Sequence, residues 1–536
     1  MITLLRQRLR RDRVQLLLWI LGTVLMSYAG YAGVIQSYGT ESGRVTVLAA
    51  VTANPVIMMF RGLPSGASEG QFMAFEILPW LAMLAALMST FLAVRHTRGD
   101  EEAGRAELVA STRAARTRPT VATLVHGVAA NVVLGVLVAL ALSGAKLDAA
   151  GSWLTGAVTA TTGIAFLGIG LMSAQLMRTS RGANSLTVWI LVGTFLLNGI
   201  GNAAGTPSTD LTRIASTWIV WLSPFGWAEQ ARPYDTDLWG PALVGLACGV
   251  ALAILATALQ SVRDLGEGFI PARRGRVHAR PGLASSQALV WRLSYGSLIG
   301  WAIGGALTGI LATTLSGLLG QVSSGNKQVT DILQKLSGGS SLDNVVITVF
   351  FTMLGILGAC AAVQTLGRAR QEEAHGTAEL VLSTSVGRAR WLSGHLIVAV
   401  ASTVIVAAAA MATGYLGAAA HHGSAELYRN ITVTGLSEMV AAAVFAVVTA
   451  LIFVLMPRAT IALGWSLLLL ATLFGMFGPL FGLPEWTTHL SPFGVTPVMK
   501  GDSVDVRGLW WLVGIVVVGW AASLGLMRRR ELASDG

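Results

Sequence analysis

The sequence predicts an all-α integral membrane protein with twelve transmembrane helices, arranged as two parallel six-helix repeats. The 536-residue chain is 53% hydrophobic and only 12% charged, whereas soluble domains are ~25% charged. Apolar runs close to the ~20 residues that a helix needs to cross a bilayer recur along the whole chain. Matching motifs then follow one another in the same order in the two halves. We therefore expect one six-helix unit to occur twice.

Twelve apolar runs mark the predicted spans. In the first half they are Leu16–Gly33, Leu78–Val94, Val121–Leu142, Leu154–Leu176, Leu186–Ala203 and Leu243–Leu259. In the second half they are Leu298–Leu319, Val345–Leu366, Leu392–Leu416, Leu436–Met456, Ile461–Phe477 and Trp510–Met527. An even number of spans in each copy gives both copies the same orientation, so the repeat is parallel. Internal repeats of this kind are common in transporters.

The clearest sign of duplication is a polar loop after the second span of each half. Arg98-Gly-Asp-Glu-Glu-Ala-Gly-Arg-Ala-Glu-Leu-Val-Ala-Ser-Thr112 aligns without a gap with Arg370-Gln-Glu-Glu-Ala-His-Gly-Thr-Ala-Glu-Leu-Val-Leu-Ser-Thr384. Leu222-Ser-Pro-Phe-Gly226 recurs as Leu490-Ser-Pro-Phe-Gly494, and Arg10, Trp19 and Gly22 align with Arg292, Trp301 and Gly304. We expect a first half over residues 1–268, a basic linker over 269–284, and a second half over 285–536.

Basic residues set the expected orientation. Most of the 37 Lys and Arg residues fall in segments that lie inside the cell when the amino terminus is cytoplasmic. This distribution follows the positive-inside rule, so we predict a multi-pass protein with both termini cytoplasmic. The net charge of +10 then reflects topology and attraction to anionic lipid. We expect membrane lipid, and no nucleic acid, among the partners.

Several kinds of chemistry are missing from the sequence. No lysine follows a glycine, so the chain has no Gly-Lys-Ser/Thr phosphate loop and should not bind ATP by itself. It also lacks a Cys/His cluster and a His-Glu-x-x-His motif, so we predict no metal site. We expect no catalytic residues in this chain.

The repeated loop carries acids at its start and arginines at its end. This order suits a short helix, because the charges complement the helix dipole. Leu108 and Val109 add a small apolar patch to the first copy, and Leu380 and Val381 add one to the second. A helix lying on the inner leaflet would have its carboxylates repelled by anionic lipid. The duplicated acids therefore favour a soluble protein partner that presents basic or polar groups.

At the level of motifs, the loop resembles the coupling-helix loop of type-two ABC exporter permeases. The shared pattern is Glu-x-x-Gly-x-x-Glu-Leu-Val-x-Ser-Thr between the second and third spans. Gly376-Thr-Ala-Glu379 follows the family closely, whereas Arg105 departs from it at the Thr position. The Ser-Pro-Phe-Gly segments resemble the re-entrant outer segment of that family. The whole chain resembles the fused twelve-span permeases of the actinobacterial tetronasin and polyketide-antibiotic exporter group.

This resemblance implies a permease in a bacterial plasma membrane that exports hydrophobic or amphipathic small molecules, such as antibiotics. The permease would hold no cofactor, and two copies of a separate ABC ATPase would bind ATP and Mg²⁺. Each coupling loop, near 98–118 and 370–390, would contact one ATPase, and the substrate path would lie between the halves. The implied ATPase-coupling residues are Glu101, Glu102, Gly104, Glu107, Glu372, Glu373, Gly376 and Glu379.

Polar side chains within or near the ends of the spans are candidates for the substrate pathway. They are Glu76, Asn131, Asn198, Asn202 and Glu438. Two simpler explanations stay open for the same residues. The amides would suit hydrogen bonds between helices, and the two acids would suit the headgroup region at the outer surface.

Two other functions stay open from the sequence. A major-facilitator-type secondary drug transporter also has six plus six parallel spans, but its Gly-x-x-x-Asp-Arg-x-Gly-Arg loop is missing from both copies. A polytopic lipid-modifying enzyme would need converging carboxylates or histidines at an interface. Asp235 and Asp237 are candidates for that role, but neither has a counterpart in the second half.

Overall fold

The computed structural model describes residues 1–531 apart from 53–57, 60, 113–115, 272–277, 279–284, 326–341, 421–422, 478–484, 498, 501–502 and 505. The chain divides into two compact units, Met1–Gly275 and Arg276–Gly536. Among the described residues, twelve helices are long and apolar enough to cross a membrane, six in each unit. This confirms the predicted all-α membrane fold. Most of the predicted linker, 269–284, lies outside the described residues.

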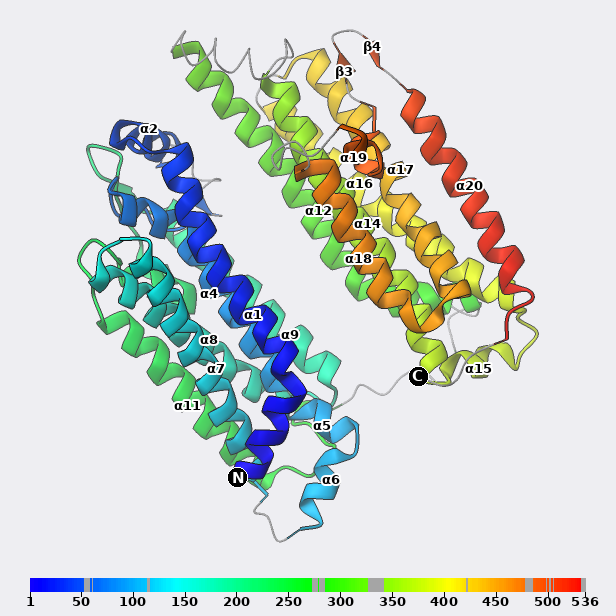
Figure 1. Ribbon diagram of the computed structural model, residues 1–536, viewed down its shortest axis with the longest axis horizontal. Helices are drawn as coiled ribbons and strands as arrows, with labels where there is room; N and C mark the ends of the chain where they lie inside the picture. The colour runs from blue at the N-terminus through cyan, green and yellow to red at the C-terminus, as the bar shows by residue number, and fades with distance from the viewer. Residues whose placement is uncertain are drawn as a thin grey trace. The chain divides into compact units, whose positions relative to one another are not determined.

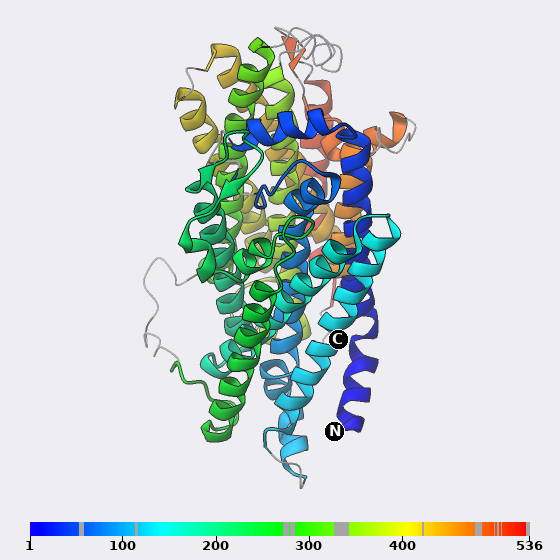
Figure 2. The same cartoon turned by 90° about the vertical axis from the view of Figure 1, so that its left-hand side faces the viewer.

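Unit 1 is built on six long helices. These are α1 (Ile2–Ser37), α4 (Glu69–Arg95), α7 (Arg118–Gly144), α8 (Ala149–Leu176), α9 (Ser180–Ala203) and α11 (Gly240–Val262). Its short elements are α2 (Glu41–Thr52), α5 (Arg98–Glu102), α6 (Arg105–Ala110), β1 (Thr206–Pro207), β2 (Ile214–Ala215), η1 (Trp218–Leu222) and α10 (Pro224–Gln230). The amino terminus lies at the same end as α5 and α6, and α2 crosses the opposite end of α1 (Figures 1 and 2).

Unit 2 repeats this plan. Its long helices are α12 (Ser286–Gly325), α14 (Leu342–Ala374), α16 (Arg388–Ala420), α17 (Ala425–Leu455), α18 (Thr460–Thr472) and α20 (Arg507–Met527). Its short elements are α15 (Thr377–Leu382), η3 (Pro457–Ala459), the π-helical turn η4 (Leu473–Phe477), α19 (Glu485–His489), η6 (Pro492–Gly494), β3 (Met499–Lys500) and β4 (Ser503–Val504). Within this unit α15 and the β3–β4 hairpin lie at opposite ends (Figure 1).

Helix α8 forms the centre of unit 1, where it packs against α4, α7, α9 and α11. Hydrophobicity alone does not drive helices together in lipid, so close approach depends on small residues. Gly135 of α7 faces Gly156 of α8 so closely that a Cβ on Gly135 would lie 2.6 Å from the Gly156 carbonyl oxygen. The two glycines therefore set the spacing between α7 and α8.

We expect Gly135→Leu to destabilise unit 1 strongly. The new side chain meets backbone rather than a movable side chain, and overpacking of this kind typically costs ~1–3 kcal/mol or more. Gly144→Leu on the same helix is the matched control, because no heavy atom lies within 4 Å of its added Cβ. Thermal unfolding in detergent should show a lowered midpoint for the Gly135 variant only. Equal midpoints for both variants would contradict the close packing of α7 on α8.

Candidate functional site

Each repeated loop folds into a short helix that follows a left-handed glycine. Gly104 has φ 69° and precedes α6, and Gly376 has φ 70° and precedes α15. Only glycine adopts this conformation without steric cost. Gly104 and Gly376, which align in the two repeated loops, therefore have the same structural role. Each lets the chain turn into the short helix that follows.

A buried ion-pair cluster anchors the first loop to its own unit. Glu101 accepts hydrogen bonds from Arg98 Nη1 at 2.7 Å and from Arg263 Nη2 at 2.5 Å. Arg263 is the first residue after α11, and Arg98 also donates to the carbonyl oxygens of Ala174 and Glu267. The carboxylate thus ties the loop to the end of the last helix of unit 1.

The second loop is anchored in the same way. Glu373 accepts a hydrogen bond from Arg530 Nη2 at 2.5 Å and lies 3.7 Å from Arg370 Nη1. Arg530 follows α20, and its guanidinium lies over the ring of Phe453 at 4.6 Å. We call each set of one carboxylate and two arginines a clamp. Alignment of the two repeated loops identifies Arg98, Arg370 and the acids Glu101 and Glu373. It does not identify Arg263 and Arg530, which lie far from the loops in the sequence.

The remaining predicted coupling acids differ in whether they have a partner within the unit. Glu102 accepts a hydrogen bond from the backbone N–H of Ser180 at 2.9 Å, and Glu372 lies 3.6 Å from His395 Nε2. Glu107 and Glu379 are exposed. Next to them, Leu108 is 72% exposed and Leu380 is 73% exposed. We call the pairs Glu107–Leu108 and Glu379–Leu380 the loop tips.

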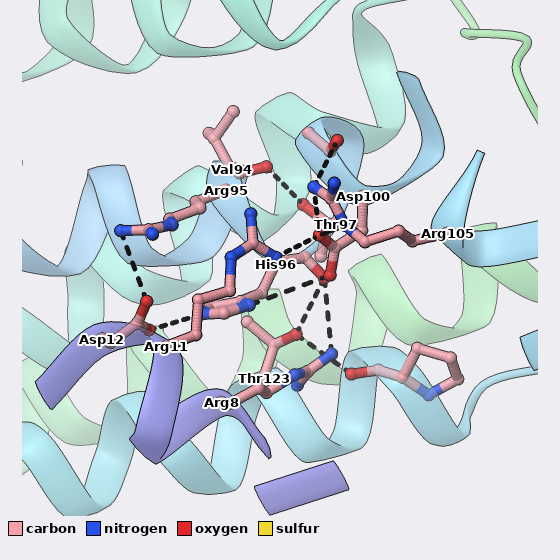
Figure 3. A network of polar contacts seen from close by, with 12 residues as sticks. Arg8, Arg11, Asp12, Val94, Arg95, His96, Thr97, Asp100, Arg105 and Thr123 are labelled. Carbon is pink, nitrogen blue, oxygen red and sulfur yellow. Dashed lines mark hydrogen bonds and ion pairs between the residues drawn. The ribbon is translucent and has the colours of Figure 1, made fainter. Parts of the chain in front are cut away.

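A polar network connects the first loop to α1 and α7 (Figure 3). Asp100 accepts hydrogen bonds from Arg11 at 2.7 Å and from Arg105 at 2.9 Å. Asp12 contacts Arg95 at 3.3 Å, His96, and His126 at 3.2 Å. One ligand atom from each of these three residues, Asp12, His96 and His126, lies within 4.8 Å of the others. No sequence motif predicts this grouping, because the three residues lie far apart along the chain. The absence of a metal stays a prediction, and Arg95 already supplies a positive charge to Asp12.

Two of the candidate pathway residues have local partners in the structure. Glu76 on α4 forms an ion pair with Arg61. Asn131 on α7 donates a hydrogen bond to Ser89 Oγ on α4 at 2.8 Å and another to the Gly127 carbonyl at 2.9 Å. Asn131 therefore makes the interhelical hydrogen bond that was the simpler explanation. A role of either residue in transport stays a prediction.

Asn198 and Asn202 converge instead on a carboxylate that sequence reasoning missed. Glu229 on α10 is 4% exposed and accepts a hydrogen bond from Asn202 Nδ2 at 2.7 Å. Burial is the main influence on its pKa and raises it to about 7, although hydrogen bonds from Asn198 and Asn202 oppose the shift. The only signal in the sequence was an acid three residues after Ser223-Pro-Phe-Gly226. This acid is not part of the repeat, because the second copy has Pro497 at the corresponding position.

Glu438 holds a comparable place in unit 2. It is 1% exposed on α17 and accepts hydrogen bonds from Thr352 Oγ1 at 3.4 Å and from Thr496 Oγ1 at 3.1 Å. Thr496 comes two residues after the second Ser-Pro-Phe-Gly segment. The surface explanation for Glu438 is therefore wrong. Each unit buries one carboxylate beside this segment, although the two acids come from different helices.

We expect Glu229 to make stability depend on pH. Below about pH 4.5 the carboxyl is protonated in both the folded and the unfolded chain. Between about 4.5 and 7 the folded chain keeps its proton while the unfolded chain releases it, so stability falls as the pH rises. Glu229→Gln should remove this fall, which amounts to roughly 3 kcal/mol at ~1.4 kcal/mol for each pKa unit. Unfolding midpoints at pH 5 and pH 8 measure the difference.

The control for this prediction is Glu69→Gln, which changes an exposed acid at the start of α4. Its effect should be the same at both pH values. If the Glu229 variant also shifts the midpoint equally at pH 5 and pH 8, the carboxyl is ionised throughout that range and the raised pKa is wrong.

Comparison with known proteins finds similarity over nearly the whole chain. A family model described as "Multidrug efflux system permease Rv1217c, C-terminal domain" matches residues 5–260 and 283–528. The multidrug efflux system permease protein Rv1217c of Mycobacterium tuberculosis is 32% identical over 539 residues. The alignment covers 99% of this chain and 94% of that protein. The chain therefore belongs to the family of the multidrug efflux system permease Rv1217c.

Proposed function

We propose that this protein is the permease subunit of an ATP-driven ABC exporter, related to the type-two exporters of the tetronasin and polyketide-antibiotic group. It moves hydrophobic or amphipathic compounds out of a bacterial cell. A separate ATPase binds ATP and Mg²⁺ and docks on the two loop tips, one copy on each. Both termini are cytoplasmic in this arrangement. The related protein is named as part of a multidrug efflux system, which supports a drug as the transported compound.

The observation that carries the proposal is the pair of loop tips. In each unit a left-handed glycine and a buried clamp fix a short helix, and the helix then exposes one carboxylate and one leucine. A leucine about three-quarters exposed to water on a rigidly held helix gains free energy when a partner covers it, by up to ~1.5–3 kcal/mol. Two copies of the same small patch suit two copies of the same partner.

Reconstitution tests the proposal. The chain should be co-expressed with an ABC ATPase encoded beside its gene, purified, and placed in liposomes. We expect ATP hydrolysis by the complex, none by the permease alone, and ATP-dependent movement of an amphipathic dye across the bilayer. Hydrolysis by the permease alone, or dye movement driven by a proton gradient without ATP, would contradict the proposal and favour a secondary transporter.

A further inference from the structure

A pocket of about 550 Å³ lies within unit 1 at the end that carries the first loop. Its walls come from the start of α1, from the loop with α5 and α6, and from the start of α7. The apolar part of the lining includes Leu4, Leu108 and Leu265. The polar part is dominated by arginine. A site with this mixture suits a molecule that has both an anionic group and an apolar portion.

The charges around the pocket are unbalanced. Five arginines line it, against the two carboxylates of Asp100 and Glu101. Both carboxylates are already neutralised: Asp100 pairs with Arg11 and Arg105, and Glu101 with Arg98 and Arg263. Of the other three arginines of the lining, Arg116 lies 3.7 Å from the exposed carboxylate of Asp264, whereas Arg8 and Arg118 form no ion pair among the described residues.

Arg8 is the most informative of these residues. It is only 6% exposed, and its Nη1 atom is buried with no hydrogen-bond partner among the described residues. Its Nη2 atom makes one long hydrogen bond, 3.4 Å, to the carbonyl oxygen of His96 (Figure 3). Asp12 and Asp100 lie near enough to attract the charge of Arg8, but a buried donor without an acceptor is costly. An anion in the pocket would supply the missing hydrogen-bond acceptor.

The second copy lacks the same features. With Arg10 aligned on Arg292, Arg8 corresponds to Val290 and Arg11 to Leu293; in the repeated loop, Arg105 corresponds to Thr377. Val290 is buried in an apolar cluster with Leu298 and Val398. Three arginines of the first copy are thus apolar or neutral residues in the second. The repeat scaffold folds without them, so their presence in unit 1 calls for a separate reason.

We propose that this pocket binds a phosphate-bearing anion, with Arg8 as the buried ligand and Arg116 and Arg118 at the rim. Guanidinium groups match phosphate geometry through paired hydrogen bonds. The phosphate can belong to the headgroup of an anionic phospholipid, whose acyl chains would lie along Leu4 and Leu265, or it can be free. The site is a property of the permease alone and does not depend on the proposed ATPase.

The test uses the purified full chain in an uncharged detergent. Dioctanoyl phosphatidylglycerol, dioctanoyl phosphatidylcholine and inorganic phosphate are titrated separately while the thermal unfolding midpoint is followed. A ligand that binds only the folded chain raises the midpoint in a saturable way. We expect phosphatidylglycerol to bind, and Arg8→Val, which copies the residue of the second unit, to weaken binding about tenfold or more.

Three further variants make the result decisive. Arg10→Ala removes an exposed charge from the same helix outside the pocket lining, and should leave binding nearly unchanged. Arg8→Lys should retain part of the affinity. Arg118→Ala, at an exposed rim position, should weaken binding even if Arg8→Val proves unstable.

Saturation by phosphatidylglycerol alone identifies a lipid site, and equal saturation by inorganic phosphate identifies a free-phosphate site. Equal losses in the Arg8 and Arg10 variants, or no saturable shift, would overturn the proposal.

Discussion

Changing both loop tips should abolish ATP-driven efflux while leaving the permease folded. The variant carries Glu107→Arg and Leu108→Asp in unit 1 and Glu379→Arg and Leu380→Asp in unit 2. Each tip would lose an apolar contact worth ~1.5–3 kcal/mol and a charge-assisted contact of similar size. The combined loss corresponds to at least about a hundredfold weaker docking at each tip. Co-purification with the ATPase and ATP-dependent dye transport measure the effect.

The control is Glu41→Arg, which makes the same glutamate-to-arginine substitution at an exposed position at the start of α2. Helix α2 lies at the opposite end of unit 1 from α5 and α6 (Figure 1), so ATPase binding should not change. Changing one tip at a time shows whether both are needed. If the four-residue variant still binds the ATPase at normal yield and still transports, the loop tips are not the docking surface.

Loss of a clamp carboxylate should destabilise its unit by several kcal/mol. Glu101→Gln leaves Arg98 and Arg263 buried beside an uncharged group, and removal of one partner from a buried ion pair typically costs ~3–5 kcal/mol. The same reasoning applies to Glu373→Gln, because Glu373 pairs with Arg370 and Arg530. We expect a lower unfolding midpoint and faster hydrogen exchange in the affected loop.

Glu107→Gln is the matched control for the clamp, because it changes an exposed acid in the same loop. Its unfolding midpoint should stay within the small range typical of surface substitutions, about 0.5 kcal/mol. This pair of variants separates two tasks that the sequence assigned to one group of acids. A midpoint for the Glu101 variant equal to that of the control would mean that the clamp adds no stability.

Hydropathy was enough to find all twelve spans, because each apolar run comes close to the length that a membrane demands. It could not find the helix ends. Helix α4 begins at Glu69, several residues before the predicted start at Leu78. Its first turn is fixed by a capping box between Ser68 and Gln71, whose polar residues lower the local hydropathy. The apolar runs predict where a span crosses the membrane, whereas the start of its helix depends on polar capping residues that such runs do not include.

From the sequence, only those residues of the candidate site that occur in both copies of the repeat could be predicted. Duplication pointed to Glu101 and Glu373. It could not show that their side chains are buried, because their partners Arg263 and Arg530 follow the last helix of each unit and are far from the loops in the sequence. It gave no help with Glu229, which has no acidic counterpart. Burial of Glu438 also escaped prediction, since position along a span does not tell which side of the helix faces neighbouring helices.

The two clamps also set an order for biosynthesis. Arg263 follows α11, so the first loop has all its clamp residues once unit 1 has left the ribosome. Arg530 follows α20, so the second loop gains its clamp only after the last transmembrane helix has been made. A nascent chain halted between these points would present one mature loop tip and one loosely held one. The second loop tip is thus held in the same way as the first only when the final helix is in place.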